Sequence, residues 1–150
     1  KDSDGSPEVK ARMRRLQMAA SQKASERAQA VDDVRDASVI ITNPTHFAVA
    51  LRYAPEERDA PYIIAMGKGP MATKIIDEGQ KHNKSVVRSP LLARALFFTG
   101  DIGLDVSEQL FSAVASVLAY VLQIERGVEA NLPDPELPDD LMYDEFGQKL

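Results

Sequence analysis

The sequence predicts an α/β protein with a small mixed β-sheet of about four or five strands, packed by about four helices and preceded by a long N-terminal linker helix. Short runs of β-branched and aromatic residues, such as SVIIT at 38–42, predict the strands. Apolar residues at helical spacing predict the helices, several of which begin at a proline. At 150 residues and 44% hydrophobic content, the chain is long enough for one domain with a substantial core.

The first predicted element is a helix over residues 8–30. This segment is rich in Ala, Gln, Arg, Lys, Met and Glu, which favour helices, and it contains no Gly or Pro. Its apolar positions form only a thin stripe, namely Val9, Met13, Leu16 and Ala20. We therefore expect a linker helix rather than a core element. Its excess of basic residues suits contact with acidic headgroups or with another protein, and it equally suits a solvated helix face.

The strands follow the linker helix. After SVIIT, the run FAVALRY at 47–53 alternates large apolar residues with alanines and an arginine, which is typical of a strand with two different faces. Further strands are predicted at YIIAM, residues 62–66, and at SVVR, residues 85–88. Three of these runs are separated by segments too short for a helix, so a mixed sheet is the simplest arrangement.

The remaining helices are predicted from residues that typically start or end a helix. Pro70 and Pro90 stand at favoured first positions, and Asn83 ends the helix that starts at Pro70. A capping pattern at Asp105 predicts the start of a last apolar helix, which ends at Gly127.

Charge divides the chain into three parts. The formal net charge of -5 combines a linker segment over 1–36 whose basic excess lies at 8–27, a neutral globular segment over 37–127 and an acidic segment over 128–150. The last segment contains three prolines among its acids, so we expect it to be largely disordered. The chain has no cysteine, which excludes disulfides and thiolate metal sites. It begins with Lys and has no apolar run long enough for a membrane span, and we expect it to be a piece of a longer protein.

The turn between the first two predicted strands has unusual chemistry. It consists of Asn43, Pro44, Thr45 and His46. Proline has no amide hydrogen, so the usual attack of the next backbone nitrogen on the asparagine side chain is impossible. The reverse ring closure remains: the Asn43 side-chain nitrogen attacks the Asn43 main-chain carbonyl and expels the Pro44 nitrogen. That reaction cuts the chain between Asn43 and Pro44 without water, metal or another nucleophile.

A fold must accelerate this reaction, because flexible Asn-Pro bonds are long-lived. Two strands that anchor the turn can hold the reacting atoms together and store strain there. His46 is a candidate for proton transfer to or from the reacting groups, and it is equally a candidate for shaping the turn by hydrogen bonding. By itself, however, an Asn-Pro pair is most often an ordinary β-turn.

The order of motifs resembles one protein family. The stretch ITNPTHFAVALRY is followed by GKG, then by SPLLARALF, then by IG and the long helix SEQLFSAVASVLAYVLQIERG. This series, over about residues 8–127, is similar to the cytoplasmic domain of the FlhB/YscU family, the substrate-specificity switch proteins of the flagellar and type III secretion export apparatus. AVALRY and LARALF are more similar to the flagellar FlhB branch.

The resemblance implies a function and a set of partners. It implies self-cleavage at Asn43-Pro44, once per molecule rather than with turnover, with Asn43, Pro44, Thr45 and His46 as site residues and no cofactor. The cut would switch export from rod and hook substrates to filament substrates. Expected partners are these export substrates, a hook-length control protein, other export-gate membrane components and the export ATPase complex. Residues 1–36 would link to a missing membrane domain, which places the chain at the cytoplasmic face of the bacterial inner membrane.

Other functional classes have weaker support. Gly67, Gly69 and Ala72 formally match a glycine-rich nucleotide-binding turn of a βαβ module, but Arg88 and Ser89 stand where an acidic ribose ligand is expected. The two histidines, His46 and the more distant His82, have no cysteine nearby, so we expect no metal site. A neutral central segment argues against nucleic-acid binding.

Overall fold

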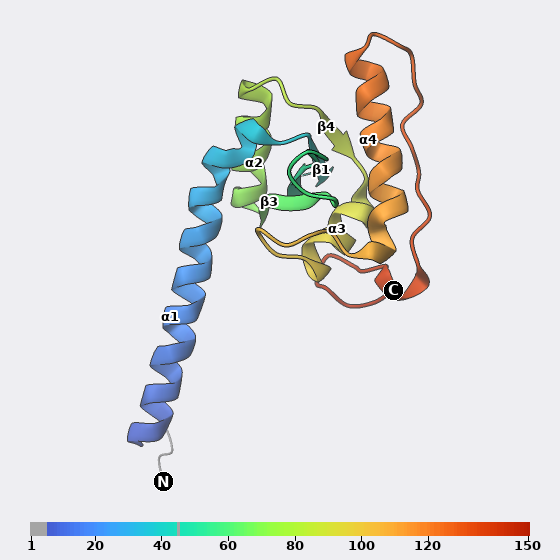
Figure 1. Ribbon diagram of the computed structural model, residues 1–150. Coiled ribbons are helices and arrows are strands. Elements are labelled where there is room, and N and C mark those ends of the chain that lie inside the picture. The colour runs from blue at the N-terminus through green and yellow to red at the C-terminus, as the bar shows by residue number, and fades with distance from the viewer. Residues whose placement is uncertain (1–5, 45) are drawn as a thin grey trace.

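The computed structural model describes residues 6–44 and 46–150, and its architecture confirms the predicted fold class (Figure 1). Its regular elements form four α-helices around one four-stranded mixed sheet. The helices are α1 (Pro7–Ala30), α2 (Pro70–Lys81), α3 (Pro90–Thr99) and α4 (Phe111–Glu125). The strands are β1 (Val39–Asn43), β2 (Phe47–Arg52), β3 (Tyr62–Lys68) and β4 (Val86–Arg88). Short 3-10 helices lie at η2 (Val31–Asp36), η3 (Glu108–Leu110) and η4 (Asp139–Leu141).

The strand order β3-β2-β1-β4 places β1 in the interior of the sheet. β1 pairs antiparallel with β2 and parallel with β4, while β2 pairs antiparallel with β3. Thus β1 and β2 form a hairpin whose turn carries the Asn-Pro sequence, and both strands have a hydrogen-bonded neighbour on their outer side. A strand with neighbours on both sides is difficult to remove from a sheet, because every ladder hydrogen bond must be given up.

Each face of the sheet is covered by its own apolar core. The large side chains of β2 (Phe47, Val49, Leu51) face α3 and α4, as the alternating pattern predicted. Its small side chains, Ala48 and Ala50, face α2 and η2. Small residues on that face let a helix approach closely, and Gly79 of α2 leaves no room for a Cβ beside the Ile40 side chain of β1. The two different faces of β2 therefore explain why helices pack on both sides.

Helix α1 projects away from the rest of the molecule (Figure 1). Its first turn is capped by the Ser6 side chain, and Ala30 at its last turn is its buried residue. The apolar residues Met13, Leu16 and Met18 are at least half exposed, so the thin stripe does not pack as a core element, as expected. Among the residues that the structure describes, no helix combines the length and apolar character needed to cross a bilayer.

The inner end of α1 is nevertheless attached to the body. The Lys23 Nζ atom lies 3.0 Å from the Asp101 carboxylate, and the Arg27 guanidinium lies 5.3 Å from the centre of the Phe97 ring. Partial burial raises the pKa of Asp101, but hydrogen bonds from Lys23 and from the Ile102 amide outweigh that effect and leave the pKa below its ordinary value. The linker helix thus ends in contact with α3 and the loop that follows it.

The C-terminal segment differs from the disordered tail that its composition predicted. After α4 the chain runs back alongside that helix and ends near α3 (Figure 1). Leu137 and Leu141 are buried in the core on the α3 and α4 side, and the Tyr143 ring packs against Phe98 at 5.5 Å. Prolines and acids do keep the segment free of long helices, but these apolar residues supply enough contact to hold it against the domain.

The start of α4 also differs from the expectation. Asp105 does not cap it: α4 begins at Phe111, after η3, and the Asp105 carboxylate instead forms an ion pair with Arg58. The Arg58 guanidinium also lies over the Tyr62 ring, 3.9 Å from its centre. The acid therefore joins the loop before β3 to the loop before α4, which is a tertiary contact that local capping patterns do not reveal.

Candidate cleavage turn at Asn43 and Pro44

The predicted reactive turn connects two paired strands directly. Asn43 is the last residue of β1, and it pairs in register with Phe47, the first residue of β2. The His46 amide donates a hydrogen bond to the Asn43 carbonyl oxygen at 2.9 Å, which closes a tight β-turn. The structure thus brings Asn43, Pro44 and His46 together, while Thr45 lies outside the described residues.

Hydrogen bonds from neighbouring loops fix both flanks of the turn. The Gly69 amide, between β3 and α2, donates to the His46 carbonyl oxygen at 2.9 Å. On the other flank, the Ser89 amide donates to the Thr42 carbonyl oxygen at 2.9 Å, and Thr42 itself is buried. The loops that precede α2 and α3 therefore restrict the two ends of the hairpin turn.

Aromatic packing against α3 anchors the turn. The Phe47 side chain is 2% exposed, and its ring lies 4.9 Å from Phe97 and 5.4 Å from Phe98 between ring centres. These distances are typical of favourable aromatic pairs. Because Phe47 directly follows His46, burial of its ring limits how far the turn can move relative to α3.

The reacting groups themselves are accessible. Asn43 is half-buried, whereas Pro44 and His46 are exposed. Asn43 and His46 line a surface hollow of about 370 Å³ together with Arg94 and four C-terminal residues, namely Asp144, Glu145, Phe146 and Leu150. Across residues 6–44 and 46–150, Asn83 is the non-glycine residue with a positive φ, so the described part of the turn shows no left-handed backbone. The strand pairing and flanking hydrogen bonds therefore offer anchoring as one source of acceleration.

This arrangement is compatible with the ring closure predicted from the sequence. The Asn43 carbonyl carbon is held at a strand end, and its oxygen already accepts a hydrogen bond from the His46 amide. An amide donor at that oxygen stabilises the negative charge that develops when a nucleophile adds to the carbonyl. The main-chain amide of His46 is a contribution that sequence reasoning missed, since only the imidazole was considered there.

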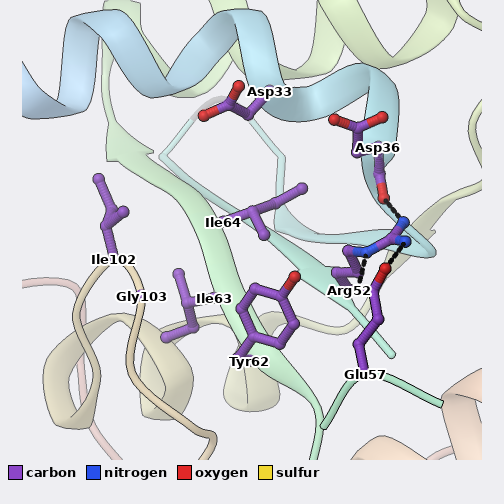
Figure 2. Close-up of a pocket in the computed structure, with 9 residues that line it drawn as sticks. All are labelled: Asp33, Asp36, Arg52, Glu57, Tyr62, Ile63, Ile64, Ile102 and Gly103. Carbon is purple, nitrogen blue, oxygen red and sulfur yellow. Dashed lines mark hydrogen bonds and ion pairs between the residues drawn. The ribbon is translucent and has the colours of Figure 1, made fainter. Parts of the chain in front are cut away.

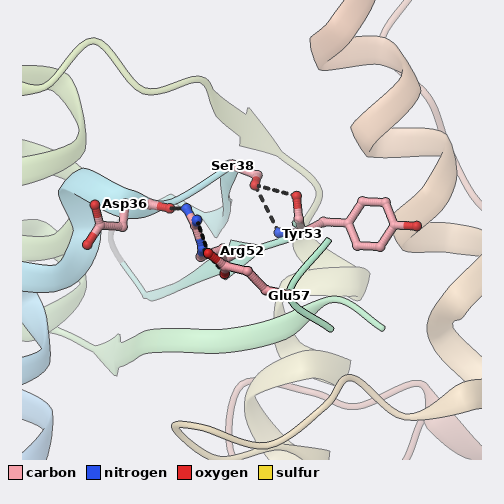
Figure 3. Close-up of polar contacts among 5 residues, drawn as sticks. All are labelled: Asp36, Ser38, Arg52, Tyr53 and Glu57. Atoms are coloured by element: carbon pink, nitrogen blue, oxygen red, sulfur yellow. Dashed lines mark hydrogen bonds and ion pairs between the residues drawn. The ribbon is translucent and has the colours of Figure 1, made fainter. Parts of the chain in front are cut away.

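The opposite end of the hairpin is fastened by side chains (Figure 3). Arg52 donates from Nη1 to the Asp36 carbonyl oxygen at 2.9 Å, and it donates from Nε and Nη2 to the Glu57 carboxylate at 3.1 Å each. The Ser38 hydroxyl accepts from the Tyr53 amide at 2.9 Å. The hydrogen bond from Arg52 lowers the pKa of Glu57, and the same bond raises the pKa of Arg52. We call these five residues the hairpin clamp: Asp36, Ser38, Arg52, Tyr53 and Glu57.

A second hollow, of about 480 Å³, lies beside this clamp (Figure 2). Arg52, Glu57 and Asp36 line it together with the half-buried Tyr62 and Ile64 of β3. None of the described residues of the predicted cleavage site contributes to it. The two hollows therefore belong to opposite ends of the same hairpin.

The glycine-rich turn after β3 has a structural role. Gly67, near the end of β3, leaves no room for a Cβ beside the Met71 side chain, and Gly69, after the strand, has a φ of 58° that favours glycine. Since the Gly69 amide already donates to His46, it is engaged within the fold rather than free to bind a phosphate. β3 and β4, which α2 connects, lie at opposite edges of the sheet. These features do not support the alternative of a nucleotide-binding βαβ module.

Two further residues at the turn were not predicted as part of the site. Glu145 places its Oε2 atom 3.8 Å from the His46 Nδ1 atom, and Arg94 donates from Nε to the Tyr143 carbonyl oxygen at 2.6 Å. Neither contact can be deduced from spacing, because each joins segments about 50 residues or more apart in the sequence. The available signal was the presence of aromatic residues, Tyr143 and Phe146, within the acidic tail.

Comparison with known proteins identifies the family of the chain. The family model described as the FlhB HrpN YscU SpaS family matches residues 1–121. The flagellar biosynthetic protein FlhB of Salmonella typhimurium is 40% identical over 141 residues, which are 94% of this chain and 36% of that protein. FlhB of Bacillus subtilis is 38% identical over 128 residues, which are 85% of this chain and 34% of that protein. The chain thus spans about a third of the length of these relatives.

Solved structures show the same fold. The cytoplasmic domain of FlhB from Shewanella putrefaciens superposes with a TM-score of 0.72 at 36% sequence identity, covering 78% of this chain and 95% of that one. The C-terminal domain of a mutated EscU superposes with a TM-score of 0.58 at 29% identity, covering 60% of this chain and 90% of that one. With the family model matching residues 1–121 and the fold shared over 78% of the chain, the chain belongs to the FlhB HrpN YscU SpaS family.

Proposed function

We propose that this chain is the cytoplasmic part of a flagellar export-gate protein that cuts itself once, between Asn43 and Pro44, and thereby changes which substrates the gate accepts. The observation that carries the proposal is an Asn-Pro bond at the closed end of a hairpin, with the Asn43 carbonyl oxygen already hydrogen-bonded to the His46 amide at 2.9 Å. Membership in the family supports the export role.

The cutting step balances within one residue and its neighbour. The Asn43 Nδ2 atom bonds to the Asn43 carbonyl carbon, and the bond from that carbon to the Pro44 nitrogen breaks. Nδ2 loses one hydrogen and the Pro44 nitrogen gains one, so the products are a C-terminal succinimide and a free N-terminal proline. Water later opens the succinimide, but it takes no part in the cut itself.

The fold contributes in two ways. The strands and flanking loops hold Asn43 and Pro44 in one place, which raises the effective concentration of the attacking nitrogen at the carbonyl. The His46 amide stabilises the oxygen as charge develops on it. The His46 imidazole is exposed on the same turn, where it serves either to transfer the proton between Nδ2 and the Pro44 nitrogen or to shape the turn.

The cut leaves the two pieces associated, because β1 stays between β2 and β4. What changes is the surface: residues 44–46 lose one attachment and are free to move. We propose that rod and hook substrates are accepted before this change and filament substrates after it. A hook-length control protein, other gate components and the export ATPase complex would meet the same surface. We place residues 37–127 as the switch domain at the cytoplasmic face of the inner membrane, with 1–36 leading to a membrane domain.

Intact mass under denaturing conditions tests the cleavage. Wild-type protein should give two species that divide after Asn43, whereas Asn43→Ala should give one full-length chain. Asn131→Ala is the matched control, because Asn131 is also exposed but precedes leucine, and it should divide as the wild type does. A wild-type chain that stays whole for days at neutral pH would refute the proposal.

Secretion by cells tests the switch. A full-length export-gate protein that carries Asn43→Ala should still export hook subunits but should fail to export filament subunits. Secreted subunits are measured in the culture medium against the Asn131→Ala control. Normal export of filament subunits with an uncut protein would show that cleavage is not needed for the change of substrates, and it would refute that part of the proposal.

A further inference from the structure

The last residues of the chain form a small folded unit. Tyr143 and Lys149 form an antiparallel bridge, the Asp144 amide donates to the Gln148 carbonyl oxygen at 2.8 Å, and the Leu150 amide donates to the Met142 carbonyl oxygen at 3.0 Å. The Asp144 carboxylate accepts hydrogen bonds from the amides of Phe146 and Gln148, both at 2.9 Å. We call residues 142–150 the C-terminal cap. Its hydrogen bonds define a hairpin rather than a trailing end.

The cap is attached to α3. The Arg94 Nε atom donates to the Tyr143 carbonyl oxygen at 2.6 Å, and the Tyr143 ring packs on Phe98 at 5.5 Å. Gly147 has a φ of 85°, and a Cβ built on it would lie 2.9 Å from the Phe98 ring. The backbone of the cap therefore contacts this ring closely at a position where only glycine fits without displacement.

The cap meets the cleavage turn. Phe98, on which the cap rests, contacts Phe47 at 5.4 Å, and Phe47 directly follows His46. The Glu145 Oε2 atom lies 3.8 Å from the His46 Nδ1 atom, with each side chain about half exposed. Asn43 and His46 form one side of the hollow described above, and the cap forms another. Two segments distant in sequence thus meet around the atoms that react.

We propose that the C-terminal cap positions the cleavage turn, with Glu145 as a positioning residue that acts through the His46 imidazole. This inference rests on the proposed self-cleavage. A carboxylate beside Nδ1 favours ring forms that carry a hydrogen on Nδ1, and in the neutral ring it leaves Nε2 as the nitrogen with a free lone pair. At 3.8 Å the contact is electrostatic rather than a hydrogen bond, so the cap biases which imidazole nitrogen is available to the turn.

Cleavage kinetics test the proposal. Chains are made by cell-free synthesis, synthesis is stopped, and the intact fraction is followed by denaturing electrophoresis. Glu145→Gln should slow cleavage by about twofold to fivefold, which is the size expected for one half-exposed charge contact. Glu136→Gln, another exposed carboxylate of the C-terminal segment, should cleave at the wild-type rate. Equal rates for Glu145→Gln and the wild type would overturn the role of Glu145.

A double-mutant cycle separates positioning from general damage. If Glu145 acts through His46, then adding Glu145→Gln to His46→Ala should change the rate no further. Additive slowing would instead show that Glu145 acts independently of His46, and it would refute the proposal. The intact Asn43→Ala chain offers a spectroscopic check: nitrogen NMR of the His46 ring should show more of the form with hydrogen on Nε2 once Glu145→Gln is added, and an unchanged ring would count against the proposal.

Docking of the cap is tested with two glycines. Gly147→Ala should displace the cap from Phe98 and slow cleavage at least as much as Glu145→Gln does. Gly127→Ala is the matched control, because Gly127 also has a positive φ, of 77°, but has open space around its Cβ position. Equal rates for the two variants would overturn the role of the cap. If the wild type cleaves and Asn43→Ala does not, failure of these tests refutes only the proposed role of the cap. A wild type that never cleaves refutes the proposed self-cleavage itself.

Discussion

The two ends of the β1–β2 hairpin are built in opposite ways. At one end the exposed turn is closed by a main-chain hydrogen bond from His46 to Asn43, and it carries the bond that we propose is cut. At the other end the hairpin clamp joins η2, β2 and the following loop, with Arg52 at its centre (Figure 3). The difference shows how a chain could be cut without coming apart: the exposed turn itself adds one main-chain hydrogen bond, while strand pairing, the buried Phe47 ring and the clamp keep the strands in register.

The position of β1 strengthens this contrast. As an interior strand, β1 shares main-chain hydrogen bonds with both β2 and β4. Val39, Ile40 and Ile41 are fully buried, and they enter the cores on both faces of the sheet. A cut after Asn43 would therefore leave the N-terminal piece as an interior strand with buried side chains, which is the arrangement hardest to dissociate.

The largest expected effect changes the chemistry of the turn end. Pro44→Ala gives this position an amide hydrogen, so its nitrogen can attack the Asn43 side chain. We expect the two fragments to disappear, and we expect slow deamidation of Asn43 in an intact chain instead. Mass spectrometry distinguishes these products, because deamidation adds only the small mass difference between an amide and a carboxylate. Fragments that form at the wild-type rate in Pro44→Ala would show that the missing amide hydrogen of proline is not what directs Asn43 toward chain cleavage.

The next effect removes the anchor beneath the turn. Phe47→Ala deletes a ring that is 2% exposed and touches both Phe97 and Phe98, so we expect a loss of about 3–5 kcal/mol in the free energy of unfolding. Urea unfolding of chains that also carry Asn43→Ala measures this loss without interference from cleavage. Phe111→Ala, at a ring that is 36% exposed on α4, is the control and should cost much less. Equal losses at the two positions would show that Phe47 is not an anchor.

Much of the fold was predictable because its signals are local. Alternation in FAVALRY assigned the faces of β2 correctly, and the prolines at 70 and 90 marked the first residues of α2 and α3. The start of α4 was wrong, because Asp105 forms a distant ion pair with Arg58 in place of a local cap. The disordered tail was inferred from charge and proline content, and that reasoning gave too little weight to Leu137 and Leu141, which are buried in the core.

The site could be predicted only where consecutive residues determine its chemistry. The Asn-Pro sequence shows which bond can break, and the flanking β-runs show that the turn joins two strands. No local pattern shows that the loop at Gly69 holds the His46 carbonyl oxygen, or that Glu145 lies near the His46 ring. Those contacts depend on how strands and loops distant in sequence come together, which requires the three-dimensional fold.

A smaller effect is expected at the clamp end. Arg52→Ala removes hydrogen bonds to the Asp36 carbonyl oxygen and to the Glu57 carboxylate at a partly exposed position, so we expect a loss of about 1 kcal/mol. In the cut protein this loss should appear as easier release of the N-terminal piece, by roughly fivefold. Size-exclusion chromatography in graded urea measures that release. Arg35→Ala, an exposed arginine of η2, is the control.

The smallest expected effect is electrostatic, and it concerns the Glu57 carboxylate at the clamp end of the hairpin. The hydrogen bond from Arg52 holds the pKa of Glu57 below its ordinary value, so this contact stabilises the fold above the ordinary carboxyl range. The contribution is lost as the pH falls from the ordinary carboxyl range through the lowered folded-state pKa. The urea midpoint of the Asn43→Ala chain should therefore fall more steeply with acid than that of the same chain carrying Glu57→Gln. Because Glu57 is exposed, added salt should reduce the difference. Parallel curves for the two chains would show that the clamp depends on geometry alone, with no measurable contribution from its charges.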